Sequence, residues 1–230
     1  MINEGKMNKV HYYFGWFEGV VPPEVARAIN NDLAGNKSIA IITTTPIDHE
    51  ETDKYVEFTR STWFAPAGII FEEYRVIDHR ISKEKAHELL KNASAILLHG
   101  GYPTQLKNFI AEYDMAAAIR NSNANVIMGA SAGGMNMAAK FVDDRIEPAE
   151  IRDGLGLDNF ALESHAYFAI ESLEGDEHTK INLMPLSQEI DVYLACTEST
   201  IRIQNGRQDI HGDVFVISDS KISKLPESGF

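Results

Sequence analysis

The stretch VIMGASAGGM, residues 126–135, decides the fold of this chain. A short apolar run ends in Gly-x-Ser-x-Gly and continues into small and apolar residues, which predicts a strand, a sharp turn at Ser131 and a helix. In such a nucleophile elbow the tight backbone lifts the serine hydroxyl clear of the sheet edge. Gly129 and Gly133 suit the places where strand and helix nearly touch, because a Cβ there would clash. The alternative is an ordinary strand-to-helix turn whose serine caps the helix.

Working outward from this stretch, strand and helix patterns alternate about five times in the first 140 residues, as expected of a parallel sheet with helices on both faces. The chain is therefore expected to adopt an α/β fold with three layers. Ligands in such folds bind at the carboxyl ends of the strands. The expected strands cover 10–14, 39–42, 69–77, 95–98 and 125–128, and the helices between them begin at Pro22-Pro23, Asp48, Ser82 and Thr104, the last running through Ala117.

The last ninety residues have a different pattern. Short apolar runs at 192–196, 200–203 and 214–217 predict antiparallel strands, and Asn205-Gly206 is a strong hairpin signal between the second and third of them. No linker or change in composition interrupts the chain. We therefore expect a single domain over residues 1–230, in which these strands form an antiparallel C-terminal extension.

The composition limits the classes of partner. The net charge of −13 disfavours binding to a nucleic-acid backbone or an anionic membrane surface. The single cysteine, Cys196, excludes an intramolecular disulfide and a multi-cysteine metal site, and we expect no metal and no cofactor. Neither a signal peptide nor a membrane-spanning run is visible, which favours a cytoplasmic protein. A small peptide substrate fits these limits, and so does a homodimer.

A serine nucleophile needs a base, and eight histidines are available. His49, His79, His87 and His178 lie in polar or helical stretches typical of a solvated surface. His165 ends an apolar strand-like run after the elbow, and His99 adjoins Gly100-Gly101, so either could face the site. The sequence does not show their mutual geometry, and both remain candidates for the base at this point.

The remaining parts of a hydrolytic site also have candidates. Glycine lets a backbone amide approach a ligand closely, so Gly100-Gly101 suits an oxyanion hole, with the amide of Ala132 as a second donor. Gly100-Gly101 equally fits a plain turn, and the chain contains no phosphate-binding glycine motif. The acids that could orient the base, none of them favoured by spacing alone, are Asp143, Asp144, Glu147 and Glu163.

Three motifs together resemble a known family. A buried strand ends in Gly-Gly-x-x-Thr, a second strand about thirty residues later ends in Gly-x-Ser-Ala-Gly, and His165 follows a Gly-Leu-Gly-Leu turn and an apolar run. This combination resembles the serine peptidases that include aspartyl dipeptidase (peptidase E) and cyanophycinase. The resemblance covers roughly residue 39 to the C-terminus. It implies the class I glutamine amidotransferase-like, flavodoxin-like fold, with serine replacing the cysteine of those enzymes.

Carried over to this chain, the resemblance implies a Ser131, His165 and acid triad, with the acid at Asp143 or Asp144 and slightly in favour of Asp143. It implies oxyanion-hole amides at Gly101 and Ala132. Tyr102 and Thr104 are then expected to contact the substrate.

One departure concerns substrate choice. The dipeptidase branch shows Gly-Gly-Asn-Thr, whereas this chain has Gly-Gly-Tyr-Pro-Thr at 100–104, so the branch's preference for an acidic first residue does not carry over. We expect a serine hydrolase that cleaves a dipeptide or a short peptide or isopeptide. Two alternatives stay open: a non-catalytic binding module on the same fold, and an α/β-hydrolase-type esterase with His211 as its base.

Overall fold

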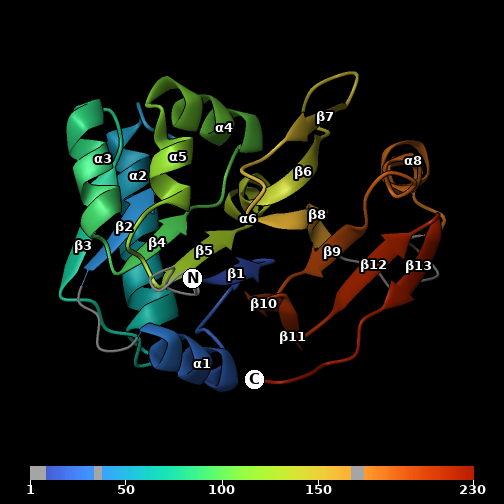
Figure 1. Cartoon of the computed structure of the whole chain (residues 1–230), viewed down its shortest axis with the longest axis horizontal. Coiled ribbons are helices and arrows are strands. Elements are labelled where there is room, and N and C mark those ends of the chain that lie inside the picture. The colour runs from blue at the N-terminus through green and yellow to red at the C-terminus, as the bar shows by residue number, and fades with distance from the viewer. Residues whose placement is uncertain (1–8, 34–37, 167–173) are drawn as a thin grey trace, which may run out of the picture.

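In the computed structural model, residues 9–33, 38–166 and 174–230 are described, apart from the side chains of 165 and 166. Their strands form two sheets that lie side by side (Figure 1). Sheet A has the order β11 (Arg207–His211), β10 (Thr200–Gln204), β1 (Val10–Phe14), β5 (Val126–Ala130), β4 (Ala95–Leu98), β2 (Ser38–Ile42) and β3 (Glu73–Ile77). The five strands from β1 to β3 in this order run parallel, whereas β10 pairs antiparallel with β1 and β11 pairs antiparallel with β10. The expected parallel sheet is confirmed.

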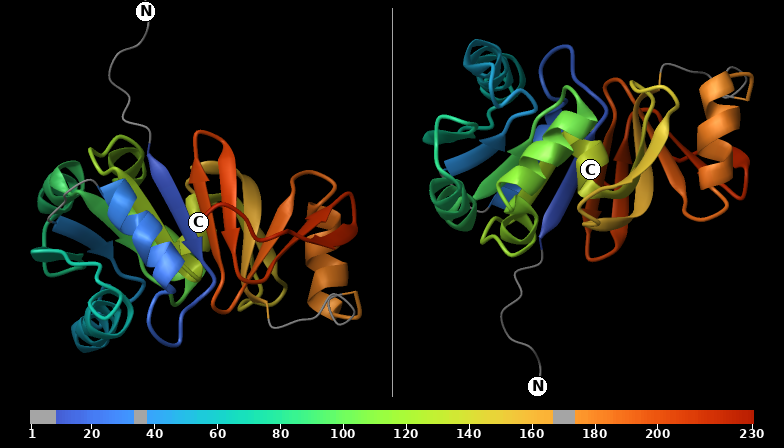
Figure 2. Two further views of the ribbon diagram at one scale, coloured as in Figure 1. Left: turned by 90° about the horizontal axis from the view of Figure 1, so that it is seen from below. Right: turned by 90° about the horizontal axis from the view of Figure 1, so that it is seen from above.

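Helices cover both faces of sheet A, as Figure 2 shows from opposite sides. Alternate strand residues point to opposite faces, so Ile39 and Ile41 join one hydrophobic core while Ala40 and Ile42 join another. On the first face lie α1 (Pro23–Leu33), α2 (His49–Phe58) and the π-helix η1 (Thr59–Phe64), and on the second lie α3 (Lys83–Asn92), α4 (Pro103–Glu112) and α5 (Met115–Arg120). The three expected layers are therefore present.

The ends of the helices follow the sequence signals except in the helix expected from Thr104 through Ala117, where both the start and the end differ. Asp48 accepts the Glu51 amide at 3.0 Å and Ser82 accepts the Lys85 amide at 3.3 Å, so both expected caps are confirmed. The expected cap at Thr104 is wrong, because α4 already begins at Pro103, where a proline loses no helical hydrogen bond. The helix also does not continue through Ala117, since Asp114 has a positive φ of 55° and separates α4 from α5.

Sheet B contains C-terminal strands together with three strands from the middle of the chain. Its order is β13 (Lys221–Lys224), β12 (Val214–Ser218), β9 (Val192–Cys196), β8 (Asp158–Ala166), β6 (Ala138–Asp143) and β7 (Glu150–Asp153). The pairs β6–β8 and β8–β9 are parallel, so this part is a second mixed sheet instead of a purely antiparallel extension. The π-helix η2 (Thr179–Leu183) and the short α8 (Met184–Leu186) place Leu183 and Leu186 in its hydrophobic core.

The hairpin predicted at Asn205-Gly206 exists, but its second strand is not the run that the sequence predicted. It joins β10 to β11, and β11 lies in sheet A, whereas the run at 214–217 belongs to sheet B. The sequence of β11, RQDIH, carries too few apolar residues to be predicted as a strand.

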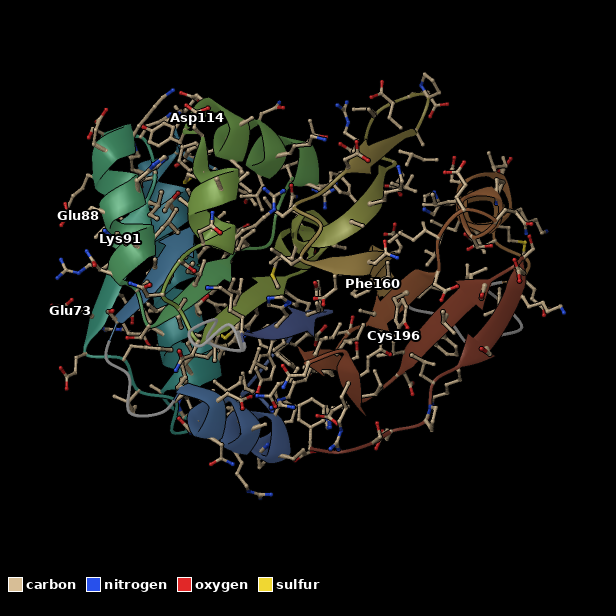
Figure 3. The ribbon with its side chains drawn as sticks, viewed as in Figure 1. Glu73, Glu88, Lys91, Asp114, Phe160 and Cys196 are labelled. Atoms are coloured by element: carbon tan, nitrogen blue, oxygen red, sulfur yellow. The ribbon has the colours of Figure 1, made fainter. Side chains whose placement is uncertain are left out.

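The two sheets meet along β1 and β8. The ring of Phe160 on β8 lies 5.0 Å from that of Tyr13 on β1 and 4.6 Å from that of Tyr193 on β9 (Phe160 is labelled in Figure 3). Beside it, Asp158 Oδ2 lies 2.7 Å from His11 Nδ1 and accepts the Tyr13 hydroxyl at 2.6 Å. The short helix α6 (Ala132–Met137) leads from β5 of sheet A into β6 of sheet B, so the elbow stands where the sheets join. Within the described residues, no helix is long and apolar enough to cross a membrane.

Candidate active site

Ser131 occupies a sharp turn between β5 and α6. Its backbone has φ 50° and ψ −117°, a conformation that residues with a Cβ rarely adopt. The two glycines around it behave as the sequence predicts: a Cβ on Gly129 would lie 2.6 Å from Gly133 C, and a Cβ on Gly133 would lie 1.9 Å from Leu98 O. The strand and helix therefore meet as closely as a nucleophile elbow requires.

A cavity of about 650 Å³ opens beside Ser131. Sheet A contributes Gly101 and Ser131 to its wall, from the loops that follow the neighbouring parallel strands β4 and β5. Sheet B contributes the opposite wall. The ionisable residues in the described part of its lining are Asp144, Arg145, Glu163, Asp176 and His178. The site therefore spans both sheets at their junction.

The Gly100-Gly101 loop lies directly against the elbow. A Cβ on Gly100 would stand 3.4 Å from the Cβ of Ser131 and 2.7 Å from Cζ3 of Trp16. Gly101 has φ +136° and borders the cavity. The two loops are neighbours because β4 and β5 pair in parallel.

Of the histidines considered for the base, His165 lies on β8 next to the elbow. The preceding residue, Ser164, donates its hydroxyl to the backbone oxygen of Ser131 at 3.4 Å. The side chain of His165 is outside the described part of the chain, so its role stays a prediction.

The other two candidate bases point elsewhere. His99 is 2% exposed and lies behind the glycine loop, where its ring stacks on Trp63 with an interplanar angle of 7°. His211 is on β11, an edge strand of sheet A, and its Nδ1 lies 3.0 Å from Glu24 Oε1. Neither ring borders the cavity.

Asp143 ends strand β6 and is buried. Its Oδ2 accepts the hydroxyl of Thr104 from the start of α4, and its Oδ1 accepts the amide of Arg145 at 3.2 Å. Asp143 is 2% exposed, whereas the neighbouring Asp144 is exposed. Asp143 does not border the cavity. Thr104 does not border it either, because its hydroxyl is directed at Asp143. Glu147 is exposed on the β6–β7 turn.

Glu163, one of the candidate acids, lines the cavity together with His178, a pairing that the sequence did not predict. His178 Nε2 lies 3.6 Å from Glu163 Oε2, and both atoms are buried. Burial raises the pKa of the Glu163 carboxyl, and the pKa of His178 is raised by its interaction with Glu163. The prediction that His178 is a solvated surface residue is wrong. No local pattern could have corrected it, because η2 meets β8 only in the folded chain.

A comparison with models of known protein families assigns the chain to a family. The family model described as Peptidase family S51 matches residues 23–211. The chain belongs to this peptidase family. The resemblance inferred from the glycine, serine and histidine motifs is thereby confirmed.

Two solved structures resemble the peptidase over nearly their whole length. A peptidase from an acI-B1 Actinobacterium is 17% identical with a TM-score of 0.72, and the match covers 100% of this chain and 98% of that one. A Listeria monocytogenes EGD-e protein described as a candidate peptidase E is 16% identical with a TM-score of 0.60, over 89% and 98% of the two chains. At these identities the likeness establishes the fold. No match is found among curated protein sequences.

The outer rim of the peptidase's site carries a cation–π contact. The guanidinium of Arg145 lies 4.7 Å from the centre of the Tyr102 ring, and Tyr102 is 51% exposed. Tyr102 does not border the cavity itself, although Pro103 does. Among the side chains that the structure describes, which exclude that of His165, no three of His, Cys, Asp or Glu gather in a way that could hold a metal ion.

Proposed function

We propose that the peptidase is of the serine type and that Ser131 is its nucleophile. The strained elbow is the observation that supports this most directly. A non-glycine residue with φ 50° costs about 1–3 kcal/mol, and such strain persists where it serves a function. Here it holds the serine at the wall of the cavity.

In the proposed mechanism His165 takes the proton from Ser131 Oγ as that oxygen attacks the scissile carbonyl. The amides of Gly101 and Ala132 stabilise the negative charge that develops on the carbonyl oxygen. His165 then gives its proton to the departing amine, and water releases the acyl group in a second, equivalent step. We assign Asp143 as the acid that holds the imidazole in its reactive tautomer, with Glu163 as the alternative acid.

The proposed substrate is a dipeptide or a short peptide or isopeptide. A cavity of about 650 Å³ falls within the range of sites that enclose small molecules. Among the described residues that line it, the carboxyl groups of Asp144 and Asp176 outnumber the guanidinium of Arg145, while Glu163 is paired with His178. This balance favours a free α-amino group and disfavours an acidic first side chain, so we expect neutral or basic first residues to be cleaved faster.

The test is a panel of dipeptides varied at the first position and measured by amine release, with Ser131→Ala as the blank. A small fluorophosphonate should label wild type once, on Ser131, and leave Ser131→Ala unlabelled; mass spectrometry of the peptides checks this. Cleavage of simple esters but of no peptide would favour the esterase alternative. An unlabelled Ser131 in an inactive protein would favour the binding module.

The acid is identified by three matched substitutions. Asp143→Asn should lower kcat by about 10³-fold or more, because loss of the orienting acid leaves the wrong tautomer. Asp144→Asn, the neighbouring control, should change kcat only slightly. A large loss in Glu163→Gln together with a small loss in Asp143→Asn would assign the acid to Glu163.

A further inference from the structure

The peptide group between Gly100 and Gly101 is held by two buried donors. Thr44, in the loop after β2, donates its hydroxyl to the Gly100 oxygen at 2.7 Å. Nδ1 of His99 lies 3.3 Å from the same oxygen. Thr44 is 1% and His99 2% exposed, and neither lines the cavity. A carbonyl oxygen can only accept, so Nδ1 is the nitrogen that carries the proton.

The protonation state of His99 is consistent with this arrangement. Burial lowers its pKa to about 4, so the ring is neutral near pH 7 and carries one proton. With that proton on Nδ1, Nε2 is an acceptor, and Thr59 Oγ1 lies 3.0 Å from it as the donor. Stacking on Trp63 fixes the plane of the ring. His99 is therefore a rigid second support for the Gly100 oxygen.

Holding this oxygen also orients the amide on the other side of the peptide bond. Among the described residues only Glu147-Pro148 is cis, so the Gly100-Gly101 bond is trans, with its C=O and N–H pointing in opposite directions. Because the oxygen faces Thr44, the Gly101 N–H faces away from Thr44. Gly101 borders the cavity beside Ser131.

We propose that Thr44 is a positioning residue that fixes the Gly101 amide as an oxyanion-hole donor, assisted by His99. This inference rests on the serine mechanism proposed above. Thr44 also explains why residue 101 is glycine: at φ +136° a Cβ would lie 2.1 Å from Thr44 Oγ1. The space that a side chain would need is occupied by the hydroxyl that holds the loop.

The experiment compares Thr44→Val, which keeps the shape but removes the donor, with Thr44→Ser, which keeps the donor. Loss of one oxyanion-hole donor costs about 10²–10³ in kcat, so a misplaced donor should cost about 10–100-fold. KM should stay within about threefold, since the contact strengthens only in the transition state. Thr44→Ser should restore most of kcat. The matched control is Thr45→Val, because the Thr45 hydroxyl faces Thr52 at 3.3 Å instead of Gly100.

A second measurement separates positioning from a general loss of structure. A peptide boronic acid, which forms a tetrahedral adduct with the serine, should bind Thr44→Val more weakly by the same factor as kcat falls. The product amino acid should bind with unchanged affinity, and the pH profile of kcat/KM should keep its midpoint. If Thr44→Val does not fold by circular dichroism, Thr44→Cys replaces it, since a thiol is only a weak donor.

The outcomes distinguish this inference from the function on which it rests. Wild-type kcat in Thr44→Val, with Ser131→Ala inactive, overturns the role of Thr44 and leaves the serine mechanism standing. An equal loss in Thr45→Val overturns it as well, because the effect would then belong to the loop as a whole. Activity in Ser131→Ala overturns the serine mechanism and the inference together.

Discussion

Ser131 is held in a backbone conformation that costs folding energy. With φ 50° and ψ −117°, its Cβ is crowded by its own backbone, and glycine would not suffer this. We expect Ser131→Gly to be more stable than Ser131→Ala by about 1 kcal/mol, because both lack the hydroxyl and only glycine relieves the strain. Urea unfolding of the two variants measures the difference. Equal stabilities would mean that the elbow holds no strain.

His99 gives the free energy of unfolding a defined pH dependence. Burial lowers its pKa to about 4, whereas an unfolded histidine titrates near 6.5. Between these values the unfolded chain binds a proton that the folded chain excludes. The contribution of neutral His99 to the free energy of unfolding is therefore fully present above about pH 6.5, and it decreases as the pH falls toward 4. From pH 7.5 to 5, wild type should lose about 2 kcal/mol more than His99→Phe. Urea unfolding at the two pH values tests this, and parallel losses would contradict it.

The elbow as an element depends on the close approach of α6 to β4. A Cβ on Gly133 would stand 1.9 Å from the backbone oxygen of Leu98, which cannot move without breaking the strand. Gly133→Ala should therefore cost at least about 3 kcal/mol. The control is Gly134→Ala, whose Cβ would lie 3.0 Å from a side-chain methyl of Leu162 and 3.2 Å from the backbone oxygen of Gly129, so that shifts of a few tenths of an ångström accommodate it. This variant should change stability by less than about 1 kcal/mol. Similar losses in both would mean that the contact with β4 is not the cause.

Elements with strong local patterns could be predicted from the sequence, and elements that depend on distant partners could not. The apolar runs of β2, β4 and β5 and the Gly-x-Ser-x-Gly turn identified the parallel sheet and its serine. Strands β7, β11 and β13 are polar and were missed, since only their pairing makes them strands. The partnership of Glu163 with His178 was missed for the same reason, because it joins β8 to the start of η2.

At the scale of the whole molecule, each sheet contains a side chain whose signal can report its unfolding. Trp16 and Trp63 pack on sheet A, and the single cysteine, Cys196, ends β9 in sheet B (Figure 3). One hydrophobic core contains Tyr13 from sheet A and Phe160 from sheet B, so we expect the sheets to unfold together. The midpoint of tryptophan fluorescence in urea should coincide with the midpoint of Cys196 thiol reactivity. Two separate midpoints would divide the chain into two folding units.

The order of the strands also affects how the peptidase behaves at high concentration. Among the described strands, β3 and β11 are the edges of sheet A, and β7 and β13 are the edges of sheet B. Every one of them carries charged residues, as in EYRVI, RQDIH, EIRD and KISK. The edge at β11 is also partly covered, since Ile210 pairs with Ser228. Charged or covered edges oppose strand-to-strand aggregation, so the molecule is protected against polymerising through its sheets.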